Sequence, residues 1–111
     1  MNGKELKERV IREIGDRWEE SSLHGVVLKE SLVDPVKITV IDRTVEDFKI
    51  KDVPFEAWLV LEEHPVTQDG YKIIASENGE DFGLAGIGIE SDQHPILTGW
   101  YGDFWTTFKG M

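Results

Sequence analysis

Two of the three histidines lie next to carboxylates and are the residues best suited to proton transfer or metal ligation. His64 directly follows Glu62 and Glu63, and His94 follows Asp92 after one intervening residue. An imidazole titrates near neutral pH and is the commonest metal ligand, so both groups have suitable chemistry. A metal site, however, needs three or four converging donors, and each of these loops supplies at most two. We therefore expect no metal and no cofactor, and we keep His64 and His94 as candidate titrating groups.

Nucleophilic catalysis has less support in the sequence. The chain has no cysteine, which excludes thiolate nucleophiles, disulfides and cysteine-based zinc sites. No serine lies in a G-x-S-x-G setting, and paired carboxylates arise by composition in a chain with 22 acidic residues. Residues 81–83 read Asp-Phe-Gly, but the other motifs of a protein kinase are absent. These observations favour a protein without catalytic activity, and an enzyme stays open as an alternative.

Three glycines close together have a structural rather than a nucleotide-binding spacing. Gly83, Gly86 and Gly88 do not fit the pattern G-x-G-x-x-G. Glycine inside a strand marks a bulge or a place where another group packs closely on the backbone. We expect a tryptophan ring to cover this smooth face. The candidates are Trp58, Trp100 and Trp105.

The net charge of −10 is concentrated in the second half of the chain. Residues 1–51 carry 11 acidic and 10 basic side chains, whereas residues 52–111 carry 11 acidic and 2 basic ones. Such a negative field repels nucleic-acid phosphates and speeds the encounter with a cationic protein. We therefore expect a basic protein partner and no direct nucleic-acid binding; the alternative is that the charge serves solubility alone. The candidate partner-binding acids are Glu62, Glu63, Glu80, Asp81, Glu90 and Asp92.

Length and hydropathy are typical of a small cytoplasmic protein. The N-terminal residues form no apolar signal segment, and the sequence has no run of about 18 apolar residues that could span a membrane. We expect a single α+β domain over residues 1–111, cytoplasmic and without a membrane partner. Our leading hypothesis is a non-catalytic binding module. In size, acidity and lack of cysteine the chain is similar to many bacterial immunity-type inhibitors, through composition and not through a motif.

Two alternatives to a binding module stay open. The first is an enzyme or small-ligand-binding protein with a pocket lined by Trp58, Trp100 and Tyr101, in which His64 or His94 is the titrating group. The second is an interaction domain that self-associates through a sheet edge, which would make the protein a homo-oligomer. A deep pocket that combines aromatic rings, a histidine and a carboxylate would favour the first alternative.

The candidate functional residues must be positioned by helices and strands, and the first of these is an amphipathic helix predicted over residues 4–20. Apolar side chains recur at spacings of three and four from Leu6 to Trp18, and charged residues fill the other faces. Asn2 is suited to cap the first turn. Gly15 lies inside the predicted helix and is its weak point.

After this helix the hydrophobic period changes to two, which predicts strands. The Asp34-Pro35 dipeptide predicts a turn between the first two strands, and Asn78-Gly79 predicts a type I′ hairpin turn. The segment 44–50 is ambiguous, so we expect a mostly antiparallel sheet of about five to six strands. The segments with strand-like patterns, from which these five to six strands are expected to form, are residues 23–33, 36–42, 44–50, 55–63, 71–77, 82–90 and 96–102.

The C-terminal residues are rich in aromatic side chains at helical spacing. Tyr101, Phe104, Trp105 and Phe108 stand at positions i, i+3, i+4 and i+7, and Asp103 is suited to cap a helix at this point. We expect a short C-terminal helix whose aromatic face packs into the core rather than serving as an exposed binding surface.

Overall fold

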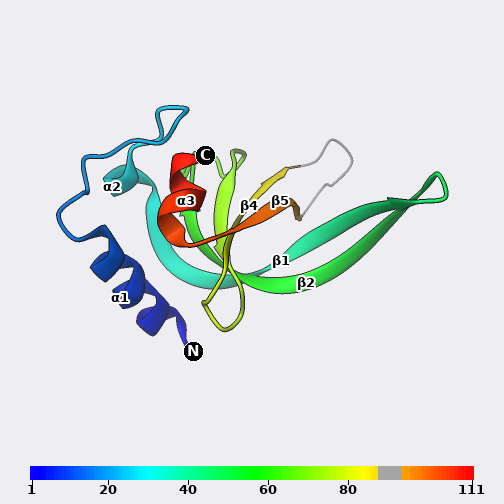
Figure 1. Cartoon of the computed structure of the whole chain (residues 1–111), viewed down its shortest axis with the longest axis horizontal. Coiled ribbons are helices and arrows are strands. Elements are labelled where there is room, and N and C mark those ends of the chain that lie inside the picture. The colour runs from blue at the N-terminus through cyan, green and yellow to red at the C-terminus, as the bar shows by residue number, and fades with distance from the viewer. Residues whose placement is uncertain (88–93) are drawn as a thin grey trace.

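The computed structural model describes residues 1–87 and 94–111 of the chain (Figure 1). The helices in this part are α1 (Gly3–Ile14), α2 (Leu28–Ser31) and α3 (Phe104–Lys109). The strands are β1 (Leu32–Glu46), β2 (Lys49–Glu62), β3 (Lys72–Ala75), β4 (Phe82–Ile87) and β5 (Pro95–Gly102). The α+β composition expected from the sequence is confirmed, with one more short helix, α2, than expected.

The five strands close into a small barrel in the order β1-β2-β3-β4-β5, with β5 returning to β1. Each strand pairs antiparallel with the next one along the chain. After five alternating strands, the first and the last point in the same direction, so the pair that closes the barrel, Ile41 with Ile96, is parallel. The hydrophobic pattern predicts the antiparallel pairs, but it contains no signal for this closure.

The second half of β2 contributes to two separate clusters of buried side chains. Ala57 belongs to a cluster made of strand residues only, which lies inside the barrel; its other members are Val40, Ile74 and Ala85. Trp58 and Val60 point to the other face and pack in a larger cluster that includes α1 and α3. The helices therefore cover the outside of the barrel wall (Figure 1).

Helix α1 is shorter than predicted. Asn2 caps it as expected, because its side-chain oxygen accepts a hydrogen bond from the Glu5 backbone N–H at 2.9 Å. The helix ends at Ile14, since Gly15 has a φ of 61° and its N–H donates back to the Ile11 carbonyl. Gly15 is thus the terminating residue and not a weak point inside a longer helix. Trp18 follows the helix and packs against the larger cluster.

The predicted hairpin around Asp34-Pro35 is wrong. Strand β1 runs through this dipeptide with only an irregular register between Leu32 and Val36, and the residues before it form α2. The true turn joins β1 to β2 at Asp47 and Phe48, inside the ambiguous segment 44–50. Both turn residues have positive φ, 49° and 63°, as a two-residue type I′ turn requires. No Asn-Gly or Asp-Gly pair marks this turn, which explains why the sequence pattern missed it.

The β1–β2 hairpin extends well beyond the barrel as a two-stranded arm (Figure 1). We call the paired residues 42–53 and their turn the arm. Arg43 and Asp52 form an ion pair across it, and Val45 lies opposite Ile50. The arm has four exposed apolar side chains: Val45, Phe48, Ile50 and Val53. Little of the arm is therefore held in place by the core.

The remaining strand predictions agree with the structure except at their ends. Residues 55–63 correspond to the second half of β2, 71–77 to β3, and 96–102 to β5. Strand β4 accounts for the first part of residues 82–90, and residues 88–93 lie outside the described part of the chain.

The β3–β4 hairpin is confirmed, but its turn is not of type I′. Residues 76–81 connect the strands, and of the two central residues only Gly79 has positive φ, at 73°. Asn78 instead folds its side chain into the loop. Its Oδ1 accepts hydrogen bonds from the Ser76 hydroxyl at 2.7 Å and from the Glu80 N–H at 3.1 Å. The loop is thus ordered by its own polar side chains.

The C-terminal helix is confirmed, with a different set of inward side chains. The Asp103 side chain accepts a hydrogen bond from the Thr106 N–H at 3.2 Å and caps α3. Phe104 and Phe108 are fully buried, and so is Thr107, which is not among the four aromatic residues predicted to face the core. Tyr101 lies in β5 and is exposed, so its assignment to the helical stripe is wrong.

Candidate binding site

The six acids proposed to bind a partner do not form one surface. Glu80 and Asp81 are exposed in the β3–β4 turn at one end of the barrel. Glu63 lies at the opposite end, beyond the last residue of β2. Glu90 and Asp92 lie outside the described residues. Of the described acids in this set, only the two in the turn lie side by side on an exposed surface.

The sixth acid, Glu62, is buried and belongs to an internal ion pair. It is 3% exposed, and its Oε1 lies 2.5 Å from Nζ of Lys72. The same ammonium donates to the Gln68 carbonyl at 3.0 Å. A buried charge with these partners is compensated and unavailable to a protein partner. Glu62 therefore holds β2 to β3 and the loop between them, and does not take part in an acidic surface.

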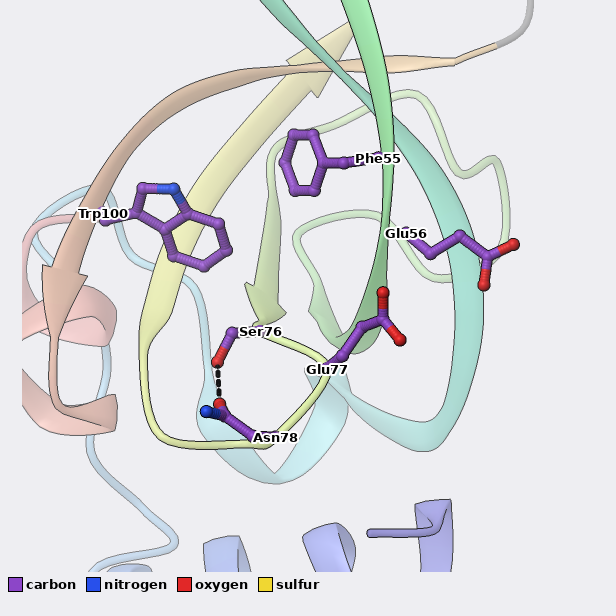
Figure 2. A pocket seen from close by; sticks show the side chains of 6 residues that line it. All are labelled: Phe55, Glu56, Ser76, Glu77, Asn78 and Trp100. Carbon is purple, nitrogen blue, oxygen red and sulfur yellow. Dashed lines mark hydrogen bonds between the residues drawn. The ribbon is translucent and has the colours of Figure 1, made fainter.

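A hollow of about 370 Å³ opens beside the β3–β4 turn, and we call it the aromatic hollow. Its lining residues are Phe55, Glu56, Ser76, Glu77, Asn78 and Trp100. In Figure 2 the rings of Phe55 and Trp100 project toward each other from β2 and β5. Their centroids are 6.0 Å apart and the ring planes are tilted by 48°. Two aromatic surfaces thus form one side of the hollow, and the polar turn forms the other.

The Trp100 ring packs on β4 at a position that has no side chain. Trp100 pairs with Gly83 across β4 and β5. A Cβ atom at Gly83 would lie 2.6 Å from the Gly99 carbonyl oxygen and 2.9 Å from Cε3 of Trp100, so a larger residue would displace the backbone of β5 and the indole. The expectation that a tryptophan covers the three glycines is confirmed only at Gly83, by Trp100, and Gly88 lies outside the described residues. Tyr71 packs on Gly86 in the same way.

Two acidic residues line the hollow, Glu56 and Glu77. In Figure 2 the Glu77 carboxylate lies between Phe55 and the turn, whereas the Glu56 carboxylate points away on the far side of β2. Oε2 of Glu77 lies 3.5 Å from Nζ of Lys37, and this ammonium also lies over the Trp58 ring, 5.4 Å from its centroid. Lys37 thus lies between a carboxylate and an aromatic ring on the outer face of β2, next to the hollow but not inside it.

Trp58 itself is buried and does not line the hollow. Its Nε1 donates to the Glu77 carbonyl at 3.2 Å, which fixes the start of the β3–β4 turn on β2. Trp58 is therefore a support of the site and not part of a pocket surface. Tyr101 is exposed but does not line the hollow either.

The histidines lie away from the aromatic hollow. His64 and His24 line a hollow of about 220 Å³, and His64 also borders one of about 260 Å³ with Glu63 and Asp69. Nε2 of His64 lies 3.8 Å from Oε1 of Glu63. A hydrogen bond from the Thr67 hydroxyl to Asp69 at 2.6 Å lowers the pKa of that carboxyl. His94 is exposed and immediately precedes β5.

The aromatic pocket and the titrating histidine of the enzyme hypothesis are thus in different places. The described lining of the aromatic hollow includes Trp100 but no histidine. His64 lies next to Tyr71, at the end of β3 opposite the turn. Within the part of the chain that the structure describes, no three His, Asp or Glu side chains gather into a group suited to a metal ion.

Sequence reasoning missed most of the residues that line the aromatic hollow. Glu77 had a local signal, because it directly precedes the Asn78-Gly79 pair that predicts the turn. Phe55 had none. It meets Trp100 across 45 positions of sequence only because the five strands close into a barrel, and the hydrophobic period does not encode that closure.

No helix in the described part of the chain is long and apolar enough to cross a membrane. Comparison with protein-family models, with curated proteins and with solved structures gives no match.

Proposed function

We propose that this protein is a non-catalytic, cytoplasmic binding module that engages a basic protein partner. The partner docks on the end of the barrel that contains the aromatic hollow and the β3–β4 turn, and we call this surface the acidic end. A module of this kind could block a basic toxin or nuclease by covering its cationic surface. In the described residues, one observation supports the proposal above the others: an exposed tryptophan and carboxylates lie together at one end of a strongly acidic chain.

The charge distribution supports this choice of surface. Residues 76–81 carry three acidic side chains and no basic one. Glu77, Glu80 and Asp81 are all exposed, and Trp100 beside them is 41% exposed. Interfaces combine a buried aromatic anchor with a charged rim that steers the partner. The acidic end contains both parts, whereas the hollows near His64 contain a single aromatic residue, Tyr71, among their described lining.

The test uses a simple cationic probe, the peptide amide (Lys-Gly)₅. We expect it to bind the wild-type protein with an affinity that falls steeply as salt is raised from about 0.01 M to about 1 M, because the Debye length shrinks from about 30 Å to about 3 Å. The double variant Glu80→Gln/Asp81→Asn should bind more weakly at low salt. It removes two charges from the acidic end without altering the lining of the hollow.

A matched control separates a specific surface from net charge alone. Glu8→Gln/Glu13→Gln removes the same number of charges from exposed positions on α1. The proposal expects this control to bind the peptide nearly as well as the wild type does. Equal weakening by both double variants would show that the peptide senses only net charge, and the proposed surface would be wrong.

A second candidate function is self-association through the arm. Both edges of the arm are without a neighbouring strand beyond the barrel among the described residues, and Phe48 at its tip is fully exposed. Phe48 is also in the left-handed region, which is costly for a bulky residue and often marks a functional position. Mass measurements over a range of protein concentrations would detect a dimer. A dimer that Phe48→Ser abolishes supports this candidate, and a monomer at every concentration rejects it.

A further inference from the structure

We infer that the aromatic hollow receives the guanidinium group of an arginine from the basic partner. This inference rests on the proposed function, and it specifies which chemical group on the partner provides the anchor. It combines three features of the described residues: a fixed aromatic face, a carboxylate at the edge of the same hollow, and a polar turn that closes the far side.

The aromatic face is preorganised. One face of the Trp100 indole lies against the backbone at Gly83, where the missing Cβ permits contact, and the hollow lies beside the exposed part of the ring. Phe55 contacts Trp100 at a tilt and limits how far the indole can turn. A planar cation can therefore stack on Trp100 without first ordering a mobile side chain.

The carboxylate is available to a second cation. Lys37 approaches Oε2 of Glu77 at 3.5 Å, which is a long contact between two exposed side chains. A carboxylate accepts from several directions, so Oε1 of Glu77 can accept from a guanidinium while Lys37 stays in place. In Figure 2 the Glu77 carboxylate lies beside β2, between Phe55 and the turn, at the edge of the hollow.

A guanidinium fits this site better than an ammonium group does. It is planar, stacks on aromatic faces and donates in a fork that matches a carboxylate. The protein already makes such a contact elsewhere: Arg17 lies over the Trp105 ring at 4.2 Å from its centroid, closer than either lysine-tryptophan contact in the described residues, at 5.4 Å and 6.0 Å. The hollow offers the same kind of surface to an arginine from outside.

The experiment titrates ¹⁵N-labelled protein with three short peptides that differ at one position. The peptides are acetyl-Gly-X-Gly-amide, with X as arginine, lysine or citrulline, the last being an uncharged analogue of arginine. We expect the arginine peptide to shift the Trp100 indole N–H and the amides of residues 76–81. Its affinity should be at least about fivefold higher than that of the citrulline peptide and at least about twofold higher than that of the lysine peptide. Equal binding of arginine and citrulline would overturn the inference, and so would equal binding of arginine and lysine.

Two pairs of variants test the named side chains against neighbours of similar exposure. Trp100→Leu should lower the affinity for the arginine peptide about fivefold. Tyr101 is the next residue of β5 and is similarly exposed, and Tyr101→Leu should leave this affinity unchanged. Glu77→Gln should lower the affinity for the arginine peptide several-fold, whereas Glu80→Gln in the same turn should have a much smaller effect. Trp100→Phe keeps an aromatic face and should retain part of the affinity. Equal effects within either pair would contradict the assignment.

The outcomes also separate this inference from the proposed function. Suppose that (Lys-Gly)₅ binding depends on Glu80 and Asp81, but that Trp100→Leu leaves the affinity for the arginine peptide unchanged. The acidic end then binds basic partners, and the hollow is not their anchor. In that case the inference fails and the proposed function stands. If neither peptide binds at the acidic end, both fail.

Discussion

The aromatic C-terminal stretch divides into two regions with opposite environments. Trp100 and Tyr101, in β5, are 41% and 43% exposed, whereas Phe104 and Phe108, a few residues later in α3, have no exposed surface. The rings of Phe104 and Phe108 stack at 6.1 Å with their planes 9° apart, in the same cluster as α1. Of its five aromatic side chains, this short segment therefore buries two in the core, presents two at the surface and leaves Trp105 half-buried between them.

The boundary between the two regions has a local cause. Gly102 has a φ of 90°, a conformation suited to glycine, and Asp103 then caps the helix. The chain thus changes from an alternating strand to a helix between Tyr101 and Phe104. Aromatic residues before this break follow the two faces of β5, and those after it follow a helical face. Aromatic density alone therefore does not reveal which rings are core.

The largest expected effect comes from shortening a ring on the buried side of this boundary. Phe104→Ala should lower the free energy of unfolding by about 3–5 kcal/mol, because it removes a fully buried ring that contacts Phe82, Trp105 and Phe108. For a protein of this size that is a large share of the total stability. Urea denaturation measures it. A loss below about 1 kcal/mol would show that α3 does not close the core.

Trp105→Ala should give an intermediate loss, of about 2 kcal/mol. The indole is only half buried, but its Nε1 donates to the Glu13 carbonyl at 3.0 Å and ties α3 to the end of α1. Arg17 also lies over its ring. Thermal and urea unfolding of this variant should fall between those of Phe104→Ala and the wild type. A loss as large as that of Phe104→Ala would place Trp105 fully in the core.

Substitutions on the exposed side of the boundary should leave stability nearly unchanged. Trp100→Leu and Tyr101→Leu should each stay within about 0.5 kcal/mol of the wild type in urea denaturation. The two variants should differ instead in their affinity for the arginine peptide, which only Trp100→Leu should lower. A large stability loss for Trp100→Leu would show that the ring closes the barrel rather than presenting a binding surface.

The smallest expected effect concerns the ion pairs that hold α3 from outside. Glu20 accepts hydrogen bonds from Lys109 at 2.6 Å and from Arg17 at 2.7 Å. The Lys109 bond, with Arg17 adding to it, lowers the pKa of Glu20 below its ordinary value of 4.5. The folded state therefore binds the Glu20 proton less readily than the unfolded state does. The resulting stabilisation is fully present above pH 4.5 and is lost as the pH falls through the lower, folded-state pKa.

Lys109→Met checks this effect. The variant should melt slightly below the wild type at pH 7, and the gap should shrink as the pH falls through the folded-state pKa of Glu20, because Glu20 then becomes neutral in both proteins. The pair is exposed, so the gap at pH 7 should be small. A gap that widened as the pH fell would contradict the assigned pKa direction.

The sequence predicts the elements whose signals are local. Asn2 and Asp103 cap their helices as expected, because a capping side chain bonds to a backbone group within three residues. The β3–β4 hairpin is also found where Asn78-Gly79 predicts it. The turn predicted at the Asp34-Pro35 dipeptide is absent, because a proline can lie in a strand at a position where its nitrogen does not need to donate a hydrogen bond to the neighbouring strand.

The parts that could not be predicted depend on contacts between distant segments. Burial of Glu62 follows from its pairing with Lys72 across two strands, and nothing in the local sequence distinguishes it from the neighbouring Glu63. The aromatic hollow requires barrel closure to bring Phe55 near Trp100. The net charge predicted an acidic binding surface, but the sequence contained no information on which acids would lie together.

The most direct test of the central claim is to map where a basic ligand contacts the protein. A peptide rich in lysine and arginine would be titrated into ¹⁵N-labelled protein while all backbone amides and tryptophan indoles are followed. The account predicts that the largest shifts occur at residues 76–81 and at the Trp100 indole, with little change at Phe48 in the arm or near His64. If the largest shifts appear around His64, on α1 or along the arm, the acidic end is not the binding surface and the proposed function is wrong.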